Sequence, residues 1–183
     1  MRAAITSFVI LGLGAAVVGL VLHGGWIDVA ASQRHPEWVE AIFHYAMERS
    51  VHRQARGIAT PEAVRNEDVE AGLVHYRAMC ATCHGAPGEP LSEIAEGLYP
   101  RPPQFSEVAS DGSDAELFWI TKHGIQMTGM PGFGATHGDD ELWDIVAVVK
   151  RLPDMDPQRY RPAERMQQAP APSHGHHDDH HGH

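Results

Sequence analysis

The sequence predicts an all-α protein, and three observations lead to this prediction. The chain of 183 residues begins with an uncharged apolar run, from Ala3 to Leu22, that is long enough to form one helix. Farther along, apolar residues recur at helical spacing after typical N-capping residues. No run of useful length shows the alternation of apolar and polar residues that marks a half-buried strand. We therefore expect helices joined by irregular loops and no sheet.

The apolar run from Ala3 to Leu22 has about the length of a membrane span. A cleaved signal peptide is the competing interpretation, with Val29-Ala30-Ala31 as the small-residue cleavage site. The polar stretch before that site is long, and the apolar run exceeds the usual core of a signal peptide. We therefore favour an uncleaved transmembrane anchor formed by residues 1–23.

The next segment, residues 24–65, is predicted to be a juxtamembrane linker that contains an amphipathic helix from Pro36 to Arg56. Its apolar face consists of Trp38, Ile42, Tyr45 and Ala46, and its C-terminal end carries Arg49, Arg53 and Arg56. Such a helix lies either at the lipid surface, with tryptophan and tyrosine at headgroup level, or against the domain that follows. The sequence leaves both placements open.

The run Cys80-Ala81-Thr82-Cys83-His84 contains the only two cysteines of the chain. Thiols three residues apart can each form a thioether with a vinyl group of a porphyrin, while the adjacent imidazole reaches the iron. A thioredoxin-like redox pair would need βαβ surroundings, and a zinc site would need two further ligands at matching spacing. Neither context is evident, so we expect one covalently bound haem c.

The segment from Lys122 to Phe133 offers candidates for the second axial ligand of the iron. Met130 lies between Gly129, which lets the backbone approach a porphyrin closely, and Pro131, which keeps the following chain extended. Met127, His123 and an open axial position are the alternatives. We favour Met130 because of these two neighbours. Histidine–methionine ligation is the pattern that raises the potential of electron-transfer haems.

These motifs resemble those of the class I cytochromes c, and more closely the bacterial membrane-anchored members with a single haem. The resemblance is carried by Cys80 to Gly85 and by Thr128-Gly129-Met130-Pro131, and it covers about residues 66–155. It implies that His84 is the proximal iron ligand and Met130 the distal one. It also implies the all-α fold of that family, here preceded by the anchor and the amphipathic helix.

Two structural contacts follow from the same resemblance. A proline-rich segment, Leu98 to Pro103, matches in type the one that lies beside the proximal histidine, where a proline carbonyl accepts the Nδ1 proton and orients the ring. The sequence does not say which carbonyl, and a plain extended loop is the alternative. The first and last helices are expected to cross where Gly72 and Tyr76 meet Trp143, which explains a glycine that costs a helix about 1 kcal/mol.

Three helices are predicted within this haem domain, residues 66–155. The first begins at Asn66, a candidate N-cap followed by acidic residues, and continues into Cys80. The second has a capping box at residues 113–116 and ends at Gly124. The third runs from near Gly138 to Pro153. The apolar positions of the third helix recur at helical spacing: Leu142, Ile145, Val146, Val149 and Leu152.

The charge of the chain is concentrated in the haem domain. Residues 67–155 contain fifteen acidic and five basic side chains, a net charge of −10 that equals the formal net charge of the whole chain. An acidic domain argues against nucleic acid as a partner. It favours redox proteins with a basic docking surface, because complementary fields speed their encounter.

The last segment, residues 156–183, is predicted to be a disordered tail rich in proline and histidine. Its six terminal histidines can bind copper, nickel or zinc ions weakly: His174, His176, His177, His180, His181 and His183.

Together these features predict a one-electron carrier anchored in the bacterial inner membrane by a single span, with the haem domain in the periplasm, where covalent haem attachment takes place. It relays electrons between membrane or periplasmic partners, alone or as a subunit of a larger oxidoreductase complex. No nucleophile or acid–base pair suggests turnover of a small-molecule substrate, so we expect no enzyme activity. The alternatives are a haem enzyme or gas or redox sensor with an open or labile sixth ligand, and a metal-handling protein that uses its histidine-rich tail.

Overall fold

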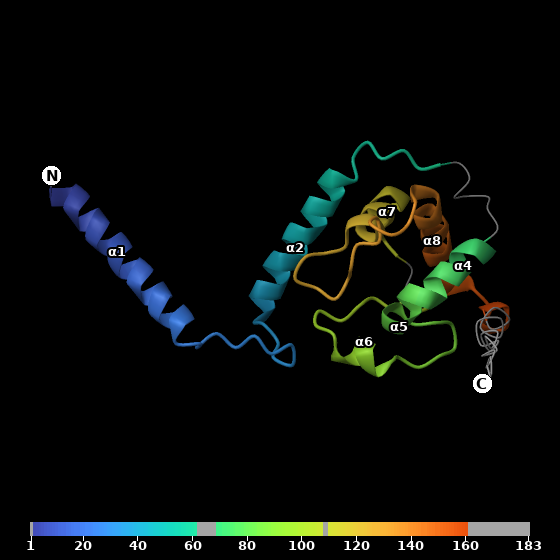
Figure 1. The fold of residues 1–183 in the computed structure, drawn as a ribbon, viewed down its shortest axis with the longest axis horizontal. Helices are drawn as coiled ribbons and strands as arrows, with labels where there is room; N and C mark the ends of the chain where they lie inside the picture. The colour runs from blue at the N-terminus through green and yellow to red at the C-terminus, as the bar shows by residue number, and fades with distance from the viewer. Residues whose placement is uncertain (1, 62–68, 108–109, 161–183) are drawn as a thin grey trace, which may run out of the picture.

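The computed structural model describes residues 2–61, 69–107 and 110–160. Over these residues the chain is helical and has no strand, which confirms the predicted all-α class. The elements are α1 (Arg2–His23), α2 (Glu37–Gln54), α4 (Glu70–His75), the π-helical turn η1 (Tyr76–Cys80), α5 (Ala81–His84), α6 (Glu93–Gly97), α7 (Asp114–His123), α8 (Asp139–Arg151) and the 3₁₀ turn η2 (Leu152–Asp154). In Figure 1, α1 stands apart at the end of a linker, while α4 to η2 gather into one helical body.

Helix α1 makes up the N-terminal apolar run. Between Ile5 and His23 it is long and apolar enough to cross a membrane, and none of that stretch is buried against the rest of the protein. A signal sequence has the same length and composition. By these criteria α1 is a candidate membrane span or signal sequence.

The helical body is built around the crossing of α4 and α8. A Cβ atom on Gly72 would meet the backbone carbonyl of Asp144 and the side chain of Val148, so only glycine allows the two helices to approach this closely. The expected crossing is therefore present at Gly72. Tyr76 and Trp143 are buried in the same core, and the ring of Trp143 stacks on Phe118 of α7 with centroids 4.2 Å apart. Consecutive residues of a helix point about 100° apart, which directs Trp143 toward α7 while Asp144 faces α4.

The ends of α7 and the apolar face of α8 agree with the sequence. The hydroxyl of Ser113 accepts a hydrogen bond from the Glu116 amide at 3.3 Å, and the Glu116 carboxylate accepts one from the Ser113 amide at 2.9 Å. Helix α7 ends at Gly124, whose φ is 71°. The predicted apolar positions of the last helix are all buried: Leu142, Ile145, Val146, Val149 and Leu152.

The first predicted helix differs from the expectation. Its candidate N-cap, Asn66, lies outside the described residues, and the described part begins at Glu70. After His75 the chain widens into a π-helical turn, which the apolar period did not predict, before α5 begins at Ala81. Such turns are rare in proteins, and those that occur often lie at functional sites.

Helix α6 was not predicted either. The hydroxyl of Ser92 accepts a hydrogen bond from the amide of Ala95 at 3.1 Å and donates one to the carbonyl of Thr82. Ser92 followed by Glu93 and Glu96 is an N-terminal signal in the sequence that was overlooked.

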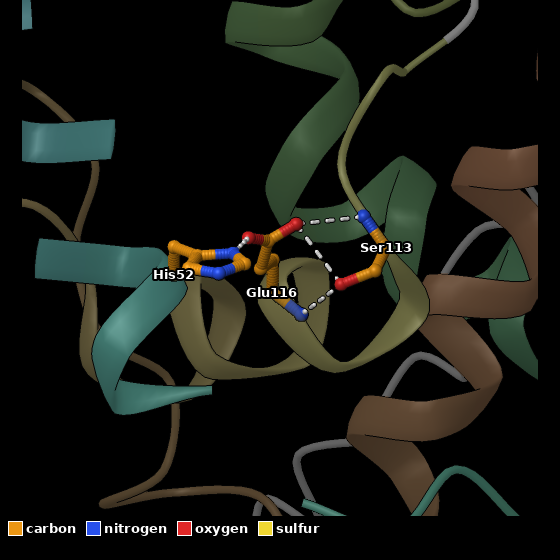
Figure 2. Close-up of polar contacts among 3 residues, drawn as sticks. All are labelled: His52, Ser113 and Glu116. Atoms are coloured by element: carbon orange, nitrogen blue, oxygen red, sulfur yellow. Dashed lines mark hydrogen bonds and ion pairs between the residues drawn. The ribbon is translucent and has the colours of Figure 1, made fainter. Parts of the chain in front are cut away.

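Helix α2 packs on the helical body through its C-terminal half, where it contacts α7. Val51 and Ala55 are each only 5% exposed. Nδ1 of His52 lies 3.0 Å from Oε1 of Glu116, and the other carboxylate oxygen of Glu116 accepts hydrogen bonds from Ser113 (Figure 2). Of the two placements that the sequence left open, packing against the following domain is therefore present.

A second contact ties the N-terminal end of α2 to the helical body. The hydroxyl of Tyr99 donates a hydrogen bond to the Glu40 carboxylate and accepts one from the His35 amide at 3.2 Å. The predicted apolar face of α2 points away from these contacts and is exposed, with Trp38 at 67%, Ile42 at 58% and Tyr45 at 65%.

Candidate functional site

The π-helical turn and α5 place the two thiols and the imidazole of the motif on consecutive turns. Cys80 is buried and Cys83 half-buried, and both are free cysteines. Burial, and to a smaller extent the neighbouring Cys83, together raise the pKa of the Cys80 thiol to about 12. The Cys80 thiol therefore remains protonated at neutral pH.

His84 is buried and firmly oriented. Its Nδ1 donates a hydrogen bond of 2.9 Å to the carbonyl oxygen of Pro103, and its ring stacks on Phe105 with centroids 4.6 Å apart. Burial lowers the pKa of His84, and the hydrogen bond to Pro103 opposes this only in part. The imidazole is therefore neutral, with its Nε2 lone pair available to a metal. The contact that the resemblance implies is present, and its acceptor is Pro103.

Gln104, which sequence reasoning missed, fastens the proline-rich segment to α5. Its Nε2 donates to the carbonyl of Cys83 at 3.1 Å and to that of Pro102 at 3.0 Å. The turn between them depends on Gly85, whose φ is 75° and where a Cβ atom would meet the Gln104 side chain. The only signal for Gln104 in the sequence was its place directly after the prolines.

The loop that contains Met130 folds back against the end of α7. The amide of Ile125 donates to the carbonyl of Met130 at 3.1 Å. The hydroxyl of Thr128 accepts from the amide of Met130 at 3.1 Å and donates to the carbonyl of Ile125 at 2.7 Å. These bonds fix the backbone on both sides of Met130, whose side chain is half-buried.

This loop lies beside the segment that holds His84. A Cβ atom on Gly129 would come within 2.7 Å of the Leu98 side chain, so glycine is needed for the approach. Leu98 begins the proline-rich segment that ends at Pro103. The structure thus brings the regions of both expected axial ligands together through the contact between Gly129 and Leu98.

The two alternative ligands lie in different surroundings. Met127 is 89% exposed and has a φ of 59°, a left-handed conformation that is unusual for a residue other than glycine. His123 is exposed in the last turn of α7, with its ring 5.0 Å from that of Trp119.

The donor set fits a covalently attached porphyrin. It offers two free thiols and an imidazole whose Nδ1 is already committed, while Nε2 of His84 makes no hydrogen bond within the described part of the chain. Over the same residues, no group of three or more His, Cys, Asp or Glu side chains could hold a metal ion, so the zinc interpretation gains no support there. The terminal histidines, 174–183, lie outside the described residues.

The comparison with protein families agrees with this geometry. Residues 67–148 match the family model described as cytochrome C oxidase, cbb3-type, subunit III. The match covers a little under half of the chain and includes both the motif at Cys80 and the loop at Met130. No curated protein matches the chain.

Proposed function

We propose, on the premise that residues 67–148 belong to the class I cytochrome c family, that the protein carries single electrons on a covalently bound haem c. When bound, the haem supplies an iron that alternates between two oxidation states. The observation that carries the proposal is the state of His84: a buried, neutral imidazole held by Pro103 directly after two free thiols.

Each residue of the motif has a separate role in holding the haem. Cys80 and Cys83 would hold the haem through two thioether bonds, and Nε2 of His84 would bind its iron. The carbonyl of Pro103 fixes the tautomer and the orientation of the imidazole and raises its basicity as a ligand. Gln104 keeps that carbonyl in place through its bonds to α5.

Met130 provides the distal ligand in this proposal. Its backbone is fixed by Thr128 and Ile125, and its loop already lies against the proline-rich segment. A thioether on the distal side raises the potential of the iron. Because the ligand loop is held by its own hydrogen bonds, little needs to rearrange when an electron enters or leaves.

Helix α1 indicates where the carrier is located, and the net charge of its haem domain indicates which partners it favours. Covalent haem attachment in bacteria takes place outside the cytoplasmic membrane, so the haem domain lies in the periplasm. Helix α1 serves as its inner-membrane anchor in this proposal. Redox proteins are the partners of the family, and the net charge of −10 over residues 67–155 favours those with a basic docking surface.

Substituting the distal ligand tests the proposal. In Met130→Ala the weak near-infrared band of methionine-to-iron coordination is expected to disappear from the oxidised protein, and the reduced protein is expected to bind carbon monoxide. Met127→Ala, a matched change at an exposed methionine of the same loop, is expected to keep the band and to exclude carbon monoxide.

Two results would contradict the carrier. Ready binding of carbon monoxide by the unchanged protein would show an open or labile axial position and favour a haem enzyme or a sensor. Loss of colour from the polypeptide after denaturation and acid extraction would show that the haem is not covalently attached to Cys80 and Cys83.

A further inference from the structure

Helix α2 has two faces with different surroundings. One packs on the helical body through Val51, Ala55 and the contact between His52 and Glu116. The opposite face carries residues at steps of three and four, which place them on one side of a helix. In the N-terminal half of α2 these residues are apolar and more than half exposed: Trp38, Ile42 and Tyr45.

The same outward face continues into a basic patch. Arg49 and Arg53 extend the row of Trp38, Ile42 and Tyr45 at the same spacing, and Arg56 follows in the turn after α2. All three arginines are exposed. Together with His52 they line one concavity at the end of α2. Within the described residues none of the three arginines forms an ion pair, although the domain beside them is strongly acidic. The described part of the helical body therefore pairs no carboxylate with these three arginines.

We infer that the outward face of α2 binds the surface of a membrane that contains anionic phospholipids. Tryptophan and tyrosine favour the headgroup level of a bilayer, and arginines at a membrane surface pair with lipid phosphates. The occupant is a membrane because of the chain that precedes α2: α1 is a candidate span, and only residues 24–36 separate it from Glu37. Fully extended, such a linker spans about 45 Å, so α2 stays close to any bilayer that α1 crosses.

The consequence is that α2 lies between the membrane and the helical body. Because its other face is fixed to α7 and to Tyr99, docking of α2 holds the whole haem domain in one orientation at the surface. A domain on a free linker would instead sample many orientations. The inference extends the proposed function but does not depend on the haem, since no residue of the patch belongs to the haem site.

The test measures the exposure of α2 in the full chain with its haem. The protein is placed in nanodiscs of zwitterionic phospholipid alone or mixed with anionic phospholipid, and oxidation of Trp38 and Tyr45 by hydroxyl radicals is followed by mass spectrometry. Trp119, which lies on α7, serves as the internal reference. Oxidation of Trp38 and Tyr45 is expected to slow in the anionic discs and to recover at high salt.

A pair of charge variants gives the matched comparison. An arginine at an anionic surface contributes about fivefold to binding, so Arg49→Ala/Arg53→Ala is expected to lower the ratio of docked to free α2 by about 30-fold. Arg101→Ala/Arg159→Ala removes the same charge elsewhere and is expected to behave like the unchanged protein. An unaltered haem spectrum shows that each variant is folded.

The inference is overturned if Trp38 and Tyr45 are oxidised equally in both kinds of disc. It is also overturned if protection is the same in the two double variants, or if it appears only after an acidic protein is added. Such a result would not contradict the proposed haem site, because the site is tested separately, by the absorption spectrum and by carbon monoxide binding.

Discussion

At the scale of single residues, the orientation of His84 depends on a side chain that has no iron-binding chemistry. Gln104 bonds to the carbonyls of Cys83 and Pro102 and so keeps the neighbouring carbonyl of Pro103 within reach of Nδ1. A hydrogen bond to Nδ1 raises the basicity of a metal-bound imidazole. In the proposed haem site, loosening this bond would weaken the electron donation that stabilises an oxidised iron. Gln104 is therefore a positioning residue.

Gln104→Ala is expected to lower the free energy of unfolding by about 1–2 kcal/mol, because two hydrogen bonds are lost at roughly 1 kcal/mol each. It is also expected to raise the midpoint potential. Denaturant unfolding and redox titration measure the two effects, and Gln158→Ala, at an exposed position, is the control. Unfolding and potential equal to those of the control would show that Gln104 does not support His84.

At the scale of elements, the packing of α4 on α8 depends on the absence of a side chain at Gly72. Gly72→Ala would push a methyl group into the carbonyl of Asp144, and such overpacking costs about 1–3 kcal/mol. Gly97→Ala adds the same methyl group to α6 in open space and is expected to cost nothing. Denaturant unfolding compares them, and equal stability of the two variants would contradict a tight crossing.

The first turn of α7 makes stability depend on pH. The pKa of Glu116 lies below its ordinary value of 4.5, first because the Ser113 amide bonds to the carboxylate, and also because of the Ser113 hydroxyl and His52. A carboxylate with a lowered pKa in the folded state contributes stability that is fully present above its unfolded pKa and is lost as the pH falls through the folded value.

Glu116→Gln is therefore expected to reduce stability at neutral pH by about 0.3–1 kcal/mol, the range for a charge at a helix N-terminus. Below the ordinary pKa of Glu116 the difference from the unchanged protein is expected to shrink. Unfolding measured between neutral and acidic pH tests this, with Glu107→Gln as the exposed control. A difference that stays constant over the whole range would show that the carboxylate charge is not the cause.

At the scale of the whole molecule, the haem domain is small for an independent core. Some 90 residues bury a modest fraction of their surface on folding, and the proposed haem would supply the missing contacts. The two thiols are free in the chain, so no disulfide replaces those contacts.

A chain without haem, prepared as Cys80→Ser/Cys83→Ser and freed of cofactor, is expected to lose much of its helicity and its cooperative thermal transition. Circular dichroism against the haem-containing protein measures both. A haem-free chain that melts cooperatively at the same temperature would show that the polypeptide core suffices by itself.

The sequence by itself determined the features that depend on neighbours along the chain. The spacing of Cys80, Cys83 and His84, the capping box at Ser113 and the buried face of α8 are all local patterns, because helical geometry brings residues three and four apart onto one side. The family match over residues 67–148 includes the motif at Cys80.

Only the tertiary structure decided which distant segments meet. The choice of Pro103 as the acceptor for His84, the support from Gln104 and the docking of α2 on α7 depend on residues 19 to 64 positions apart in the chain. No periodicity encodes such contacts, since they form when packing fixes the backbone of two loops or helices against each other. The local sequence thus indicated the candidate ligands and the longer helices, and the fold decided which residues hold them in place.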